Sequence, residues 1–183
     1  MKLTVRKQIY VALFAGITAV LAQFTIPLAL IPLTLQTFAV GLAVTILGMK
    51  VGTWSIVLYL LMGLIGLPVF AGGAAGFSVL FGPTGGYLVG FIFTGLVTGY
   101  ILEKTEFNYF MAFIANSAGA LVTLLFGTVW LQLSAGMTFT AAMASGFVPF
   151  IIPGIIKAAG SAYVGILIRH RLIKANRYYS VNG

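Results

Sequence analysis

The 183-residue chain contains no cysteine and no aspartate, and its only acidic residues are Glu103 and Glu106. Without cysteine, neither a disulfide nor a thiolate metal site can form. The single histidine, His170, lies between two arginines near the end of an apolar segment, a poor setting for a metal centre. The Gly-rich GPTGGY (residues 82–87) is not followed by the lysine of a phosphate-binding loop, so the chain has no ATP site of that kind.

The scarcity of carboxylates also argues against two classes of membrane protein. Proton and sodium relays through membranes normally use buried Asp or Glu, so ion-coupled transport lacks an obvious coupling group here. Glu103 and Glu106 flank Lys104 and are expected to form a solvated charge cluster. A retinal-type pigment with a Schiff base on a membrane lysine would lack its carboxylate counter-ion.

The composition is that of an integral membrane protein, because 61% of the residues are hydrophobic and only 7% are charged. The net charge of +8 would suggest a nucleic-acid partner in a soluble protein. Here the cations flank apolar blocks and do not form a face, so they are topology signals. We therefore expect the protein to lie in the lipid bilayer and to have no nucleic-acid partner.

Three charge-free blocks, residues 8–49, 51–102 and 107–156, are each long enough for two spans of about 20 residues. Six helices place both termini, Lys50 and the Glu103–Glu106 turn on one side, and the positive-inside rule makes that side the cytoplasm. The predicted fold is an all-α integral membrane protein in which residues 1–183 form one transmembrane substrate-binding domain. The expected spans are 8–29, 35–49, 52–67, 84–102, 108–133 and 145–170.

The segment between the third and fourth predicted spans, residues 63–90, is dense in glycine and carries Pro68 and Pro83. Such a sequence breaks a helix. Non-helical backbone near a membrane is tolerated where it is buried in protein or lines a cavity. We expect an extracellular Gly-rich loop that forms a lid or wall of a binding site. The alternative is close helix packing through small residues such as Gly82 and Gly86.

Lys157 is the only cation placed inside an apolar segment, FVPFIIPGIIKAAGSAYVGILI. An ionisable group at membrane depth is a functional-site candidate, and a lysine without a carboxylate partner points to an anionic ligand. If the last helix begins again at Pro153, its positive end would favour the same anion. Two alternatives remain: Lys157 extends to the interface with no ligand, or it activates Ser161, one helical turn away, in an intramembrane enzyme.

Neutral polar and aromatic side chains in the other apolar segments describe the ligand further. Gln36 and Asn116 offer paired donors and acceptors that suit an amide or urea, unless they only join helices. Tyr87 and Trp130 supply apolar walls for a ring. At about 1.5 Å of rise per residue, these side chains and Lys157 lie at middle or outer depth, below the Gly-rich loop.

The first predicted helix carries a strip of small residues, Ala12, Ala15, Gly16 and Ala19. Small side chains let another helix approach closely, which is how helices associate in lipid. The strip therefore predicts a helix-docking surface, whose partner is either internal or another subunit.

The stretch GLIGLPVFAGGAAGFSVLFGPTGGYLVGF, the six-helix pattern and the Ala15-x-x-x-Ala19 strip resemble the BioY family, the biotin-specific S-components of energy-coupling-factor transporters. The resemblance implies a protein of the cell membrane that has no catalytic activity and no cofactor and binds biotin as its transported ligand. It also implies docking through Ala12, Ala15 and Ala19 onto a transmembrane coupling subunit that carries two ABC-type ATPases.

Applied to that ligand, the candidate residues take separate roles. Lys157 is assigned to the carboxylate and Asn116 and Gln36 to the ureido group. Tyr87 and Trp130 are assigned to the ring, and Gly73 of the Gly-rich stretch is a further substrate-binding candidate. The alternatives are an S-component for another small carboxylated vitamin and a stand-alone facilitator.

Overall fold

The computed structural model describes residues 4–28 and 30–175, and this part of the chain is mainly helical. Lys2 and Arg177, which we expect at the cytoplasmic side, lie outside the described residues. Helices Gln36–Leu64, Gly85–Lys104 and Tyr109–Ala135 and the stretch Phe139–Lys174 are long and apolar enough to cross a membrane. The elements are α1 (Val5–Leu21), β1 (Thr25–Ile26), β2 (Leu33–Thr34), α2 (Gln36–Leu64), η1 (Ala71–Gly73), α3 (Phe77–Phe81), α4 (Gly85–Lys104), α5 (Tyr109–Ala135), α6 (Phe139–Gly146) and α7 (Val148–Lys174).

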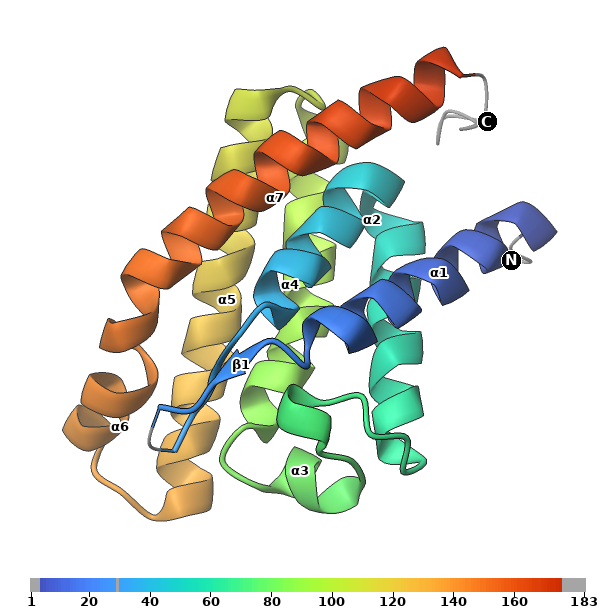
Figure 1. Cartoon of the computed structure of the whole chain (residues 1–183). Coiled ribbons are helices and arrows are strands. Elements are labelled where there is room, and N and C mark those ends of the chain that lie inside the picture. Colours follow the sequence, from blue (N-terminus) through green and yellow to red (C-terminus); the bar gives the residue numbers. More distant parts are fainter. Residues whose placement is uncertain (1–3, 29, 176–183) are drawn as a thin grey trace.

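Helix α2 consists of two arms that meet at a sharp bend (Figure 1). Gly48 has φ 80°, a left-handed conformation that favours glycine. A Cβ added to Gly52 would come within 2.7 Å of the Val44 backbone, so the second arm folds back against the first. The predicted spans 35–49 and 52–67 are therefore two arms of one bent helix.

Two charged side chains from other helices satisfy backbone groups at this bend. The Glu103 carboxylate of α4 accepts a hydrogen bond from the Met49 amide at 2.8 Å, so Glu103 caps the bend. Its side chain is exposed, which agrees with the solvated charge that we expect from the sequence. Arg169 of α7 is buried, donates to the Ile46 carbonyl at 2.7 Å and lies 3.5 Å from the centre of the Phe107 ring. The bend is thus fixed by groups on α4 and α7.

The bundle has two unlike ends (Figure 1). The start of α1, the α2 bend, the α4–α5 connection and the end of α7 lie toward one end. The opposite end carries α3, the segment between α1 and α2, and the α5–α6 connection. Helix α4 packs between α2 and α5, and α7 packs against both α2 and α5.

Helix α1 ends at Leu21, so the predicted span 8–29 is too long. The chain then forms a short antiparallel hairpin whose strands are Thr25–Ile26 and Leu33–Thr34. Pro27 and Pro32 lie at the two ends of the connection between these strands. The apolar run continues past the helix end, and hydropathy does not distinguish an apolar hairpin from a helix.

Between the end of α2 at Leu64 and the start of α4 at Gly85, the Gly-rich segment is mainly non-helical and contains only two short helical elements, η1 and the five-residue α3. The Gly63 carbonyl accepts a hydrogen bond from the Gly76 amide at 2.8 Å, which closes the segment on itself. A Cβ at Gly63 would overlap the ring of Phe70, which is almost fully buried. Glycine at position 63 therefore allows Phe70 to pack into the core.

The last predicted span, 145–170, corresponds to α7, which is preceded by the short helix α6. Helix α7 begins at Val148 with Pro149 in its first turn and continues through Pro153. Lys157 therefore lies well inside the helix. The expectation of a helix N-terminus at Pro153 is wrong.

Candidate functional site

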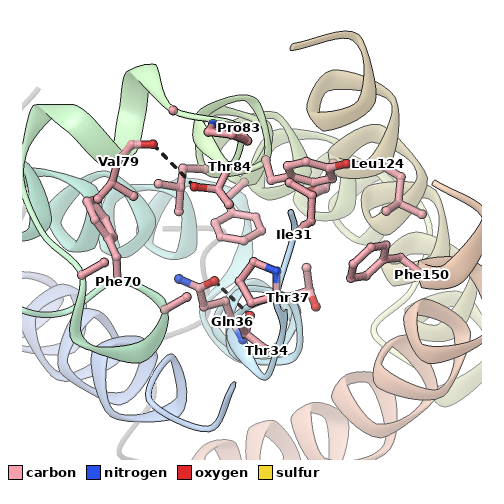
Figure 2. A pocket seen from close by; sticks show the side chains of 18 of the residues that line it. Ile31, Thr34, Gln36, Thr37, Phe70, Val79, Pro83, Thr84, Leu124 and Phe150 are labelled. Atoms are coloured by element: carbon pink, nitrogen blue, oxygen red, sulfur yellow. Dashed lines mark hydrogen bonds between the residues drawn. The ribbon is translucent and has the colours of Figure 1, made fainter. Parts of the chain in front are cut away.

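A cavity of about 340 Å³ lies at the end of the bundle that carries the hairpin and α3. Its walls are mostly apolar and come from several elements: Ile31 and Pro32 of the hairpin turn, Phe70, Val79 and Pro83 among others of the Gly-rich segment, Phe91 of α4, Leu124 of α5 and Phe150 of α7. Figure 2 shows Phe70 and Phe150 on opposite sides, with Thr34, Gln36 and Thr37 together on a third. Small-molecule sites have volumes of about 300–1,000 Å³, so the cavity suits a small organic ligand.

Lys157 lines this cavity and is its only charged lining residue in the part of the chain that the structure describes. The ammonium donates to the Thr34 carbonyl at 3.0 Å, so the side chain points inward and does not extend to the membrane interface. An ammonium has three donors, and one of them is used here. Neither glutamate of the chain lines the cavity, which leaves the positive charge without an internal carboxylate.

Gln36 also lines the cavity, and its amide is held by a chain of hydrogen bonds. The Tyr59 hydroxyl donates to the Val69 carbonyl at 3.1 Å, so it accepts a bond from the Gln36 amide nitrogen. The Gln36 oxygen accepts from the Thr34 hydroxyl at 2.9 Å. This arrangement fixes which way the amide faces and leaves one N–H and one lone pair for a ligand.

Tyr87 forms part of the wall through its ring, while its hydroxyl donates to the Gly146 carbonyl at 2.7 Å. Trp130 does not line the cavity. Its indole N–H donates to the Gly82 carbonyl at 2.9 Å, so Trp130 holds the Gly-rich segment without facing the cavity. A Cβ at Gly86 would overlap the Trp130 side chain, so this segment also uses the close glycine packing that we consider as the alternative.

Asn116 is buried below the main cavity and lines a second cavity of about 10 Å³. Its amide donates to the Thr45 hydroxyl at 2.9 Å and to the Ala112 carbonyl at 2.8 Å, so it joins α5 to α2. Gly73 lies in η1 and does not line the main cavity. Ser161 donates to the Phe38 carbonyl, whereas Lys157 donates to the Thr34 carbonyl, which gives no nucleophile–base pair.

The small-residue strip of α1 is divided between two surfaces. Ala15 is fully buried in the core cluster that contains Val40 and Phe70, and Ala19 packs partly against it. Ala12 is exposed, and a Cβ added to Gly16 would meet no atom within 4 Å. Ala12 and Gly16 therefore border open space on the outside of α1, whereas Ala15 packs internally.

The sequence reasoning missed Thr34, Thr37 and Tyr59. Thr34, Gln36 and Thr37 are a group of polar residues that follows Pro32 at the start of a predicted span, within an otherwise apolar stretch. That signal identifies Thr34 and Thr37 as candidates. Tyr59 gives no comparable signal, because it meets Gln36 only when the second arm of α2 folds back.

The fold and the cavity together define a class: a multi-pass membrane protein with an internal cavity that, among the described residues, is lined by one partly buried cation. The family model for the BioY family matches residues 1–174. The chain belongs to the BioY family.

Relatives and a solved structure agree with that assignment. The chain is 41% identical over 170 residues to biotin transporter BioY2 of Lactococcus lactis subsp. cremoris (strain MG1363), which covers 93% of each protein. It is 38% identical over 165 residues to biotin transporter BioY of Thermotoga maritima, covering 90% of this chain and 96% of the relative. The crystal structure of the S-component for biotin from an ECF-type ABC transporter matches with a TM-score of 0.85 and 29% identity, over 92% of this chain and 95% of that one.

Proposed function

We propose that this protein is the biotin-binding S-component of an energy-coupling-factor transporter and delivers biotin for ATP-driven uptake. The observation that carries the proposal is the single cation in a mostly apolar cavity of a BioY-family protein. Biotin has one carboxylate, one ureido group and an apolar fused ring. These groups match Lys157, the fixed Gln36 amide and the aromatic walls, respectively.

In this proposal the chain crosses the membrane six times with both termini in the cytoplasm. The two arms of α2 count as separate crossings, and α1, α4, α5 and α7 supply the others. The end that carries Lys50, Lys104 and Arg171 is cytoplasmic by the positive-inside rule. The Gly-rich segment then lies outside as a wall or lid over biotin, and Trp130 and Gly73 hold or shape that segment without touching the ligand.

The carboxylate assignment is tested by equilibrium binding of biotin and of biotinamide, which has no carboxylate, to detergent-purified protein. For Lys157→Met we expect biotin to lose at least about 30-fold in affinity, because removing one partner of a buried charge pair costs about 2–5 kcal/mol. Biotinamide binding should change little. Equal losses for both ligands would contradict the carboxylate assignment, and a wild-type protein that does not bind biotin would contradict the proposed function.

In this proposal other subunits supply the energy for uptake. These partners are a transmembrane coupling subunit and two ABC-type ATPases. The exposed face of α1 around Ala12 and Gly16 is the docking surface in this proposal. Ala12→Trp should abolish ATP-driven uptake in cells that express the energising subunits and should leave biotin affinity unchanged. Ala144→Trp, an exposed site on α6, is the matched control. Uptake by the Ala12→Trp protein at the wild-type rate would rule this surface out.

A further inference from the structure

One polar group in the cavity region has no partner in the described part of the chain. The Thr37 hydroxyl is buried and makes no hydrogen bond. Two threonines within helices bond back one turn, Thr18 to the Phe14 carbonyl and Thr45 to the Gly41 carbonyl. Thr37 is the second residue of α2, so the residue four before it is in β2 and offers no helical carbonyl.

Its position distinguishes Thr37 from the other buried hydroxyls without a partner. The structure shows three more in the described residues, on Thr53, Ser117 and Thr128, and these line neither cavity. Thr37 lines both the main cavity and the small one below it. Nearby hydroxyls are already engaged: Thr34 donates to Gln36, and Thr123 shares a bond of 2.6 Å with Thr94.

Lys157 also lines both cavities. It is bonded to the Thr34 carbonyl, three residues before Thr37. Figure 2 shows Thr34 and Thr37 close together on the same side of the pocket. A ligand group between Lys157 and the start of α2 would therefore meet an ammonium and a free hydroxyl together.

We propose that the Thr37 hydroxyl is a second contact for the ligand carboxylate, binding one oxygen while Lys157 binds the other. This inference rests on the proposed function. A carboxylate has two oxygens that accept hydrogen bonds, and a hydroxyl bonded to a charged acceptor contributes more than one bonded to a neutral group. Buried polar groups almost always have a partner, so an unpartnered hydroxyl that lines the same two cavities as Lys157 indicates that the ligand supplies the missing partner.

The test compares three variants with two ligands. Thr37→Val removes the hydroxyl and keeps the shape, Thr37→Ser keeps a hydroxyl, and Thr53→Val removes an unpartnered buried hydroxyl from the same helix away from the cavity. For Thr37→Val we expect a loss of about 10-fold or more in biotin affinity, from the worth of a hydrogen bond to a charged group. Biotinamide affinity should fall by less than about 3-fold. Thr37→Ser should stay within about 3-fold of wild type, and Thr53→Val should bind both ligands normally.

A stability measurement separates binding from folding. Because its hydroxyl is unpartnered, Thr37→Val should leave the ligand-free thermal midpoint unchanged or raise it, as should Thr53→Val. The double variant Thr37→Val, Lys157→Met should lose less affinity than the sum of the single losses, because both groups hold one carboxylate.

Three results would overturn the proposal. If Thr37→Val weakens biotin and biotinamide equally, the hydroxyl contacts another part of the ligand. If neither ligand is affected, a water in the small cavity, which has room for about one, satisfies the hydroxyl. If Thr37→Val lowers the ligand-free midpoint, the role is structural. Failure of the proposed function looks different, since the wild-type protein would then not bind biotin.

Discussion

The two ends of the bundle treat their polar groups in opposite ways. At the α2 bend, the Ile46 carbonyl has Arg169 as a donor, and the Met49 amide has the Glu103 carboxylate as an acceptor. At the cavity end, a hydroxyl on Thr37 has no partner, and Lys157 uses one of its three donors on a backbone carbonyl. Both ends contain irregular backbone and buried charge.

The difference separates stability from binding. A bend in a membrane helix is tolerated when neighbouring groups satisfy the freed backbone groups, which is what Arg169 and Glu103 do. Polar groups left incomplete in a folded protein are destabilising by themselves and characterise functional sites. Changes at the bend should therefore act mainly on folding, and changes at the cavity mainly on affinity.

The largest effect on folding is expected for Arg169→Met. The substitution leaves the Ile46 carbonyl without its charged donor and removes the contact with Phe107. We expect a loss of about 1.5–3 kcal/mol, seen as a lower thermal midpoint in detergent. Arg171→Met, an exposed neighbour on α7, removes the same charge and should have little effect. A tenfold loss of biotin affinity in the folded Arg169→Met protein would show that the ends are not independent.

Gly63→Ala is expected to affect both properties at the cavity end. The added methyl group overlaps the Phe70 ring, which fills the core and lines the cavity. Overpacking typically costs about 1–3 kcal/mol, and a displaced Phe70 should also reduce biotin affinity. Gly16→Ala is the matched control, because α1 has open space at that position. Calorimetric binding and thermal melting on both variants give the comparison, and a Gly63→Ala protein with normal affinity would mean that Phe70 does not shape the site.

These residues show how far the sequence leads. The helical class follows from the long apolar runs without charge, and the place of Lys157 in one of them marks it as a candidate. The sequence leaves open whether that side chain points inward or outward, and the hydrogen bond to Thr34 gives its direction. Rise along a helix gives depth but not the direction that a side chain faces, so Trp130 has a suitable height and still lies behind the Gly-rich segment. Hydropathy gives no clear signal for the reversal of α2 at Gly48. The contact between Tyr59 and Gln36 depends on that reversal, so the sequence does not predict it.

Tyr59→Phe should give the smallest effect and examines the fixed amide of Gln36. Without the hydroxyl, the Val69 carbonyl and the Gln36 amide nitrogen each lose a partner, at a cost of about 1 kcal/mol in the free energy of unfolding. The Gln36 amide is then free to turn over, so we expect a loss of about 3- to 5-fold in biotin affinity, which corresponds to less than about 1 kcal/mol.

Tyr163→Phe, an exposed tyrosine on α7, is the control and should behave as wild type. Biotinamide should lose as much affinity as biotin in Tyr59→Phe, because the effect acts through the ureido group and not through the carboxylate. That equality separates Tyr59 from Lys157 and Thr37, whose variants should discriminate between the two ligands. A Tyr59→Phe protein that melts earlier but binds both ligands normally would place Tyr59 with Arg169, as a group that stabilises the fold without orienting the site.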